Sequence, residues 1–280
     1  MSAWQPSAIQ LARRRYRRRQ ALASGATAGI SSVVLLGALA LLVATSPGWP
    51  RVRATFFSLA KARAAFPAVL EGLWLNLRVM LVCAVLIFCC GLALALLRTL
   101  RGPVFFPLRL AAAAFTDLFR GLPLLLVLFL MGFGVPALRL EGVTSNPLYL
   151  GGAALVLTYS AYVAEVFRAG IESVHPSQSA AARSLGLSAA QTLRYVVLPQ
   201  AIQRVIPPLL NDAVALQKDS GLIAVLGVVD AIRAAQIATA VDFNFTPYVV
   251  AGFLFVCLTI PLTRFTDWLA KRQGWYGGGR

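Results

Sequence analysis

Long apolar runs that lack charged residues are the feature that most constrains the fold of this chain. Residues 21–50 carry no charged side chain, and a helix of about 20 apolar residues is enough to cross the hydrocarbon core of a bilayer. The 280-residue sequence is 59% hydrophobic and only 13% charged, with a mean hydropathy of +0.74. Such a composition leaves too little polar surface to cover a water-soluble core. We therefore predict an all-α integral membrane protein.

The apolar runs predict six transmembrane helices, whose ends are set by charged residues, prolines and turn residues. The predicted spans are about 25–45, 75–97, 115–135, 148–167, 207–228 and 247–266. Pro136 is expected to stop the third span, because proline lacks a backbone N–H. The segment 50–71 mixes large apolar residues with arginine and lysine and is too charged to span. It predicts an amphipathic helix lying in the outer interface of the bilayer.

The distribution of arginine indicates the orientation of the chain in the membrane. Six spans place both termini on one side, and that side holds six arginines within Arg13–Arg19. It carries roughly three times as many basic residues as the other side, so the positive-inside rule makes it cytoplasmic. The same cluster predicts attraction to anionic lipid head groups. We favour this membrane role over nucleic-acid binding, and we do not expect a cleaved signal peptide, since the apolar run is too long for one.

Cysteine and histidine usage argues against metal or nucleophilic chemistry. Cys83, Cys89, Cys90 and Cys257 all lie inside apolar runs, at spacings that fit neither a zinc site nor a disulfide framework. His175 is the only histidine, so no histidine pair is available for a metal or for catalysis. A glycine-rich phosphate loop ending in Gly-Lys-Ser/Thr is absent from the sequence. We therefore predict no catalytic residue, no metal site and no cofactor in this chain.

A short polar segment separates the fourth apolar run from the fifth. Ser177 is expected to open a helix that Gly186 ends, since glycine adopts the left-handed conformation at little cost. Ser188 is expected to cap a second helix, with Gln191 three residues on in capping-box spacing. Pro199 disfavours helix at the residue before it, so we expect the second helix to end there. A helix-glycine-helix elbow between two spans offers a rigid knob to a soluble partner.

The spacing in this elbow resembles the EAA loop of the membrane subunits of bacterial ABC importers. That loop reads Glu-Ala-Ala, three residues, Gly, nine residues, an aliphatic residue, one residue and Leu-Pro. The matching residues here are Ala180, Ala181, Ala182, Gly186, Val196, Leu198 and Pro199. Ala180 stands where the loop has its glutamate, which removes one charge contact with an ATPase. We expect coupling to survive, with Arg183 or Glu172 supplying the docking charge, because the shape of the elbow is kept.

Four further stretches resemble the polar amino-acid permease branch of this family. They are Phe119–Pro123, Ala161–Ile171, Pro207–Asn211 and Leu216–Ser220. The resemblance implies a five-helix ABC importer permease core over residues 72–270, which contains the coupling loop 172–204. It leaves a cytoplasmic basic segment at 1–24, an additional transmembrane helix at 25–45, an external interfacial segment at 46–71 and a cytoplasmic tail at 271–280. The implied location is the bacterial cytoplasmic membrane.

The resemblance also implies a function and a set of partners. The chain would be the permease subunit of an ATP-driven importer for a polar amino acid, and it would catalyse no reaction itself. Separate ATPase subunits would bind ATP and Mg²⁺, an external binding protein would deliver the amino acid, and a second permease copy or a homologue would complete the path. Membrane lipid is expected as a partner and nucleic acid is not. The residues expected to couple to the ATPase are Ser177, Gln178, Ala180, Ala181, Ala182, Arg183, Gly186, Leu187, Leu198 and Pro199.

Polar residues within spans are costly and are therefore candidates for function. The fifth span carries Asn211, Asp212, Lys218 and Asp219. Pro207 and Pro208, with Gly221, allow a bent or broken helix there, which is tolerated where it lines a cavity or packs against protein. Lys218 and Asp219 are expected to pair with neighbouring groups. We predict a role for these residues in the substrate pathway or, with equal weight, in a network that holds two permease subunits together.

Arg120 and Glu165 are the other candidates for the pathway or its gate. Arg120 is expected near the cytoplasmic end of the third span, where a long side chain reaches the interface. Glu165 lies three residues before Arg168, which favours a local helical ion pair. For both residues, orientation of the gate region is favoured over contact with substrate.

Two other functions fit parts of the sequence. A secondary transporter or channel that works alone would use Asp212, Lys218 and Asp219 as an ion or proton relay. Inverted repeats would favour that reading, and none is convincing between the two halves. A membrane scaffold without transport would leave the polar span and the elbow without a purpose. Within the importer class, a permease for methionine or an anion is disfavoured by the resemblances at 161–171 and 207–211.

Overall fold

The computed structural model of this chain describes residues 7–100 and 102–272, and these residues form helices joined by short turns, with no strand among them. The chain divides into two compact units, one ending at Phe57 and the other beginning at Ser58. The predicted all-α membrane fold is confirmed. Four described helices are long and apolar enough to cross a membrane, or up to six spans exist if each of two bent helix pairs counts as one.

The first unit consists of two helices. Helix α1 spans Ala8–Ala44, and the capping box formed by Ser7 and Gln10 begins it. Its apolar part, Leu22–Ala44, is a candidate span and agrees with the predicted helix at 25–45. The helix also extends upstream through the arginine cluster. Helix α2 covers Trp49–Phe56 and has no buried residue.

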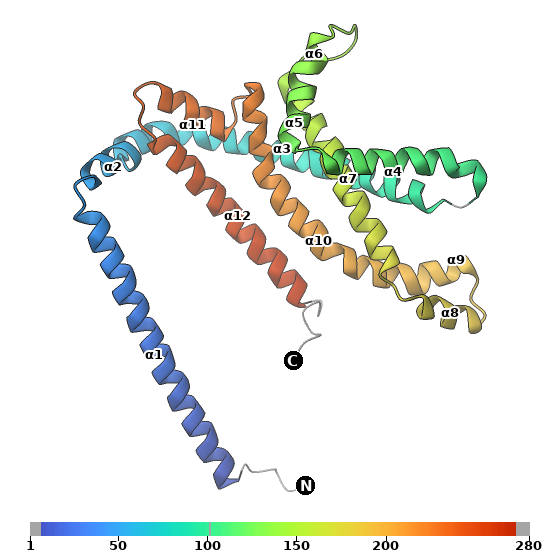
Figure 1. Cartoon of the computed structure of the whole chain (residues 1–280), viewed down its shortest axis with the longest axis horizontal. Helices are drawn as coiled ribbons and strands as arrows, with labels where there is room; N and C mark the ends of the chain where they lie inside the picture. The colour runs from blue at the N-terminus through green and yellow to red at the C-terminus, as the bar shows by residue number, and fades with distance from the viewer. Residues whose placement is uncertain (1–6, 101, 273–280) are drawn as a thin grey trace. The chain divides into compact units, whose positions relative to one another are not determined.

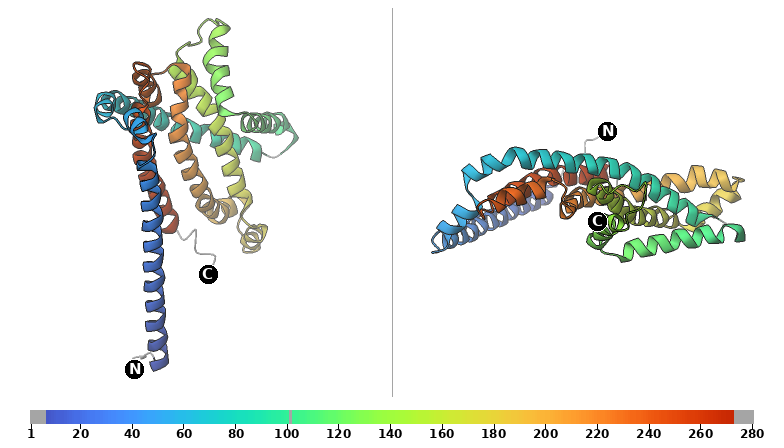
Figure 2. Two further views of the ribbon diagram at one scale, coloured as in Figure 1. Left: turned by 60° about the vertical axis from the view of Figure 1, so that its left-hand side comes forward. Right: turned by 90° about the horizontal axis from the view of Figure 1, so that it is seen from above.

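The second unit is organised around α3, which spans Leu59–Thr99. The axes of α7, α10 and α12 slope across α3 in Figure 1, with α10 running opposite to the other two along the chain, and α11 packs beside the N-terminal half of α3 (Figures 1 and 2). The core between α3, α5, α7 and η4 is built from large buried side chains, including Ile87, Leu128, Leu155, Tyr159 and Ile223. The bounds of the other elements are η1 Pro103–Phe105, α4 Phe106–Gly121, α5 Leu124–Phe129, η2 Leu130–Gly134, α6 Val135–Ala137, α7 Pro147–Glu172, α8 Pro176–Ser184, α9 Ala189–Thr192, η3 Leu193–Val197, α10 Leu198–Asp219, η4 Ser220–Leu226, α11 Ala231–Ala240 and α12 Thr246–Arg272.

The predicted amphipathic helix over 50–71 is wrong in its extent. The helical segment breaks at Phe57 and Ser58, and α3 then runs without interruption from Leu59 into the second predicted span. Residues 59–66 are rich in alanine and other strong helix formers, so nothing there ends the helix. Pro67 lies inside α3 without stopping it.

The third predicted span, 115–135, is also wrong as a single helix. Helix α4 ends at Gly121, α5 begins at Leu124, and the two segments are bent by 105°. Leu122 has extended dihedral angles of −92° and 135°, which is the conformation favoured before a proline, here Pro123. The span therefore becomes a bent pair with its corner at the Phe119–Pro123 motif. Pro136, which was expected to stop the span, lies inside the last helical turn, α6.

The fifth predicted span, 207–228, has different ends and a different break. Helix α10 begins at Leu198 and continues through Pro207 and Pro208 to Asp219. The break comes later, where the 3₁₀ segment η4 ends at Gly227 with a left-handed φ of 89°. The segment up to Leu226 is bent by 47° relative to α11.

Two glycines allow α3 to approach other backbones closely. A Cβ atom on Gly72 would lie 2.3 Å from the carbonyl carbon of Asp230 and 2.4 Å from the amide nitrogen of Ala231. A Cβ atom on Gly91 would lie 2.6 Å from a methyl carbon of Val163 in α7. Small residues at such crossings are typical of helices packed within membranes, where close van der Waals contact drives association.

Candidate functional site: an elbow joined to a polar cavity

The first helix of the elbow, α8, begins at Pro176, one residue before the predicted Ser177. His175 is its N-cap, and the His175 Nδ1 atom accepts a hydrogen bond from the Ser177 amide at 3.2 Å. Pro176 occupies the first helical turn, where its fixed φ suits the helix and its missing N–H is no loss. The expectation that Ser177 opens the helix is therefore wrong. Its hydroxyl instead lies 2.7 Å from the His175 ring nitrogen.

The turn of the elbow forms as the sequence predicts. Gly186 has a left-handed φ of 88°. The Leu187 amide donates to the Ala182 carbonyl at 3.2 Å and the Gly186 amide donates to the Arg183 carbonyl at 3.0 Å. This pair of bonds is the Schellman pattern that satisfies the last carbonyls of a helix.

A capping box starts the second helix of the elbow, α9, as predicted. The Ser188 hydroxyl accepts from the Gln191 amide at 3.2 Å, and the Gln191 side chain accepts from the Ser188 amide at 2.8 Å. The end of α8 and the start of α9, on either side of Gly186, are thus fixed by local hydrogen bonds. The turn of the elbow therefore has a shape defined by its own hydrogen bonds.

The expectation that this second helix ends at Leu198 is wrong. Helix α9 continues through the π segment η3 directly into α10. In η3 the Leu198 amide donates to the Leu193 carbonyl, five residues back, and this wider turn accommodates Pro199 just after it. The elbow and α10 are therefore one uninterrupted helical element.

Packing and one polar contact fix the base of the elbow. Val174, Val197 and Ala201 form a small buried cluster with Ile171 of α7 beside it. The Arg204 side chain donates to the Ser173 carbonyl across the same junction. Of the predicted coupling residues, Ala182 is buried and Leu187 is half-buried. The exposed ones are Ser177, Gln178, Ala180, Ala181, Arg183, Gly186, Leu198 and Pro199.

An ion cluster lies where α3, α4 and α7 meet. Glu165 is its centre and accepts from Arg98 of α3 at 3.1 Å and from the Nε atom of Arg168 at 3.0 Å. Arg120 of α4 is 3.8 Å from the same carboxylate, and Arg168 also pairs with Glu172. The predicted local pair with Arg168 is confirmed. The contact with Arg98 was not predicted, because 67 residues separate Arg98 from Glu165 in the sequence.

A polar cavity of about 360 Å³ adjoins this ion cluster. Its charged lining consists of Arg120, Glu165, Arg204 and Asp212, and Tyr162 adds a hydroxyl. The Oδ2 atom of Asp212 is buried and has no hydrogen-bond partner among the described residues. Asp212 also lines a second cavity of about 170 Å³. A buried acceptor without a partner is costly, and the residue that carries it is also one of those that line this cavity.

The other candidates of the fifth span do not line the polar cavity. Asn211 and Lys218 are exposed, and Lys218 has no ion pair within the described residues. Asp219 accepts a hydrogen bond from the Tyr159 hydroxyl at 2.7 Å. The expected pairing with neighbouring groups is therefore found for Asp219, and no such partner of Lys218 is found in the described part of the chain.

A buried polar cluster of Asn76, Ser220 and Asp230, which we call the polar knot, joins α3 to the break before α11, and no sequence pattern predicts it. The Asn76 amide group donates to the Ser220 carbonyl at 3.0 Å and to the Asp230 carboxylate at 2.9 Å. The Asn76 side-chain oxygen accepts from the Ala231 amide at 3.2 Å. Asp230 in turn caps α11 by accepting from the Arg233 amide. The knot holds η4 and α11 against α3.

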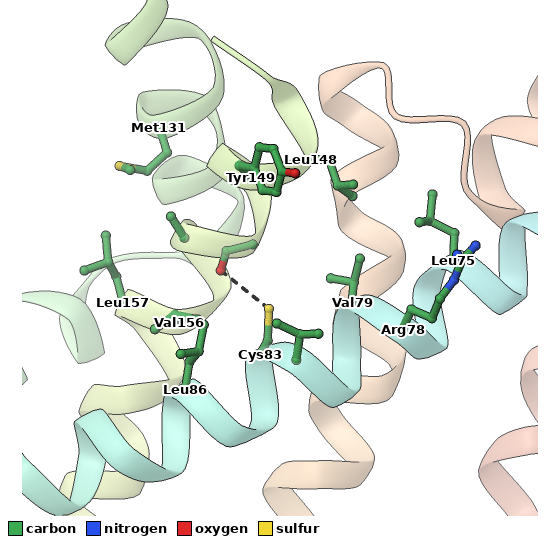
Figure 3. Close-up of a pocket in the computed structure, with 13 residues that line it drawn as sticks. Leu75, Arg78, Val79, Cys83, Leu86, Met131, Leu148, Tyr149, Val156 and Leu157 are labelled. Carbon is green, nitrogen blue, oxygen red and sulfur yellow. Dashed lines mark hydrogen bonds between the residues drawn. The ribbon is translucent and has the colours of Figure 1, made fainter. Parts of the chain in front are cut away.

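A larger cavity of about 680 Å³ between α3 and α7 has a different character. Its walls are almost entirely apolar, with Arg78 beside Leu75 at one end (Figure 3). The Cys83 thiol, at 3.7 Å from the Gly152 carbonyl, is its main internal polar contact. This lining offers little to a polar solute, so the cavity of about 360 Å³ lined by Asp212 and Arg120 is the candidate solute site.

The ion cluster yields a testable expectation. Replacing Glu165 with glutamine removes the carboxylate that three arginines share, and should lower the stability of the purified subunit by about 2 kcal/mol, since the side chains of Glu165 and Arg98 are only 21% and 19% exposed. Thermal unfolding in detergent measures this. Glu172→Gln is the matched control, because Glu172 is 62% exposed and its pair with Arg168 is worth about 0.5 kcal/mol. Equal effects of the two variants would contradict a central role for Glu165.

An all-helical membrane unit with a projecting elbow joined to a polar cavity is the arrangement of a transport permease. Residues 99–275 match the family described as binding-protein-dependent transport system inner membrane component. The chain belongs to this family of membrane transport subunits.

Relatives and a solved structure agree with this assignment. The chain is 33% identical over 198 residues to the arginine transport system permease protein ArtQ of Bacillus subtilis, covering 70% of this chain and 88% of ArtQ. It is 35% identical over 210 residues to the probable glutamine ABC transporter permease protein GlnM of the same organism, covering 74% and 94%. The crystal structure of an amino acid ABC transporter with histidines matches with a TM-score of 0.68 and 32% identity, over 74% of this chain and 94% of that chain.

Proposed function

We propose that this chain is the permease subunit of an ATP-driven importer for a polar amino acid in the bacterial cytoplasmic membrane, with both termini in the cytoplasm. The observation that carries the proposal is the continuity of the elbow with α10, which bears Asp212 in the polar cavity. One helical element thus links a docking surface to a solute site. ATP and Mg²⁺ belong to separate ATPase subunits, and a second permease copy or homologue and an external binding protein complete the system.

The charges of the cavity suit a free amino acid. Arg120 has the longest of the arginine contacts with Glu165, at 3.8 Å, while Arg98 and Arg168 already hold that carboxylate. Its guanidinium is therefore available to an α-carboxylate, which arginine binds well through two parallel hydrogen bonds. The Asp212 carboxylate, which also lines the cavity, suits an α-ammonium group. Arg204 and Tyr162 then lie beside the amino-acid side chain.

Import follows from the same connection between elbow and cavity. Closure of the ATPases displaces α8 and α9, and the unbroken path through η3 passes this displacement to α10. The wall of the cavity that carries Asp212 then moves relative to α7, which carries Glu165. The cavity opens alternately to each side, and the residues of this chain bind and release the solute without bond chemistry.

The contacts of Asp212, Lys218 and Asp219 do not support a transporter that works alone and uses them as an ion or proton relay. Lys218 is exposed, and Asp219 bonds to the Tyr159 hydroxyl and not to Asp212 or Lys218. These groups form no continuous chain of proton donors and acceptors within the described residues. The elbow, moreover, has no role in such a transporter.

Replacing Asp212 with asparagine tests the solute site. Uptake should fall about tenfold or more, because a charged hydrogen bond worth roughly 1.5–3 kcal/mol is lost. The test uses proteoliposomes that hold the permease, its ATPase and the binding protein, with a panel of labelled amino acids. Asn211→Ala is the matched control and should leave uptake within about twofold, since Asn211 is outside the cavity. Normal uptake by the Asp212 variant, with assembly intact, would contradict the proposed site.

A further inference from the structure

The apolar cavity of about 680 Å³ between α3 and α7 takes no part in the proposed solute path, and it has the form of a groove. On α3 its wall is formed by residues three and four positions apart, from Leu75 to Leu86, which share one face of the helix. On α7 the wall extends from Leu148 to Leu157. Val82 is 62% exposed, so the groove is open along its side. An apolar groove of this kind excludes water and suits a hydrocarbon chain.

Arg78 gives the groove a charged end. Among the described residues that line the cavity it is the only charged one, and it lies beside Leu75 at one end (Figure 3). Its side chain is exposed and makes no hydrogen bond or ion pair with any residue in the described ranges. The acidic residue nearest to it along α3, Glu71, is two helical turns away. A cation without a partner beside an apolar groove is complementary to an anionic group that carries an apolar tail.

The position of Arg78 along α3 places it near a membrane interface. Arg98, which belongs to the ion cluster, follows twenty residues later in the same helix, which is about 30 Å along the helix axis. That distance equals the hydrocarbon thickness of a bilayer. Tyr149, which lines the same cavity, is 66% exposed in the first turn of α7, and exposed tyrosine is typical of the interface. The groove therefore begins at the head-group level opposite the ion cluster and runs toward the middle of the bilayer.

We propose that the apolar cavity holds one acyl chain of an anionic phospholipid, whose phosphate is bound by Arg78. From Leu75 to Leu86 the α3 wall is about 16 Å long. One leaflet supplies about half of the hydrocarbon thickness, so the groove matches the depth of a single chain. Arginine pairs well with phosphate oxygens, and an anionic lipid brings no choline cation to oppose it. This lipid site is separate from the solute cavity at Asp212 and does not depend on the identity of the solute.

Photoactivatable lipids test this site in the full-length chain, purified with the subunits that accompany it and reconstituted in nanodiscs. Phosphatidylglycerol and phosphatidylcholine carry the same diazirine-labelled chain, and the labelled peptides are mapped by mass spectrometry. We expect phosphatidylglycerol to label residues 75–86 and 148–157 about fivefold more than phosphatidylcholine does, because one arginine at the membrane surface contributes a preference of about this size. Arg78→Gln should remove the preference. Ala153→Phe, which fills the cavity, should reduce labelling there by both lipids.

A matched control and three contrary results complete the test. Arg63→Gln removes the same charge from an exposed residue of α3 that lies outside the cavity, and it should keep the preference. Equal labelling of the wild-type cavity by the two lipids would refute Arg78 as the phosphate ligand. Labelling spread evenly over the apolar helices, without enrichment at the cavity, would reduce the bound lipid to ordinary boundary lipid. An unlabelled cavity, with a cross-link between two copies of the chain that forms only with Val82→Cys, would assign the groove to a second permease. Each of these three results would overturn the proposal.

Discussion

Replacing Gly186 with leucine is expected to abolish ATP-driven uptake while the subunit remains folded in the membrane. Gly186 has a φ of 88°, and an L-residue with a Cβ atom pays roughly 1–2 kcal/mol in this left-handed region. A Cβ atom built on Gly186 meets no atom within 4 Å, so the substitution begins in open space. The leucine therefore leaves the interior intact and alters the turn and the surface that meets the ATPase.

Uptake and ATP hydrolysis should be measured together in this variant. We expect hydrolysis to continue and uptake to fall to background, which is loss of coupling. Gly186→Asn is the matched variant, since asparagine tolerates the left-handed conformation and keeps the two Schellman bonds. It should retain more uptake than the leucine variant. Normal uptake with leucine at this position would remove the elbow from the account.

Replacing Gly72 with alanine is expected to prevent accumulation of the folded subunit. The added methyl group would lie 2.3 Å and 2.4 Å from backbone atoms of Asp230 and Ala231, which cannot turn aside as a flexible side chain can. Overpacking of this kind costs about 1–3 kcal/mol or more. Moving the two backbones apart also breaks the bonds that Asn76, one turn further along α3, makes to the same two residues.

The amount of monodisperse subunit extracted in mild detergent, with its thermal midpoint, measures this effect. Gly152→Ala is the matched control, because a Cβ atom there meets only the Cys83 sulfur at an ordinary 3.7 Å. We expect the control to behave as the wild type does. Equal yields of the two variants would show that α3 and α11 are not held in the close contact described here.

Features set by neighbouring residues were predictable from the sequence. The left-handed Gly186 and the capping box of Ser188 and Gln191 depend on bonds that span only a few residues, so the residue types identify them directly. The all-helical membrane fold likewise follows from apolar runs that no water-soluble core can absorb. The sequence therefore predicts where the elbow lies in the chain.

Features set by distant residues were not predictable. The partners Asn76 and Asp230 are 154 residues apart, and Arg98 meets Glu165 only because α3 crosses α7. Prolines did not predict helix ends reliably. Pro199, Pro207 and Pro208 all lie within continuous helix, because a π turn and the surrounding helices accommodate them. Pro123, in contrast, marks a bend of 105°. The link from elbow to cavity depends on this tertiary context.

The most direct test of the account is uptake by the purified subunit in proteoliposomes, with and without the ATPase that co-purifies with it. The account predicts amino-acid uptake that requires the ATPase, ATP and the binding protein together, and that is lost in Gly186→Leu. Uptake by this chain alone, driven by an ion gradient in the absence of ATP, would contradict it.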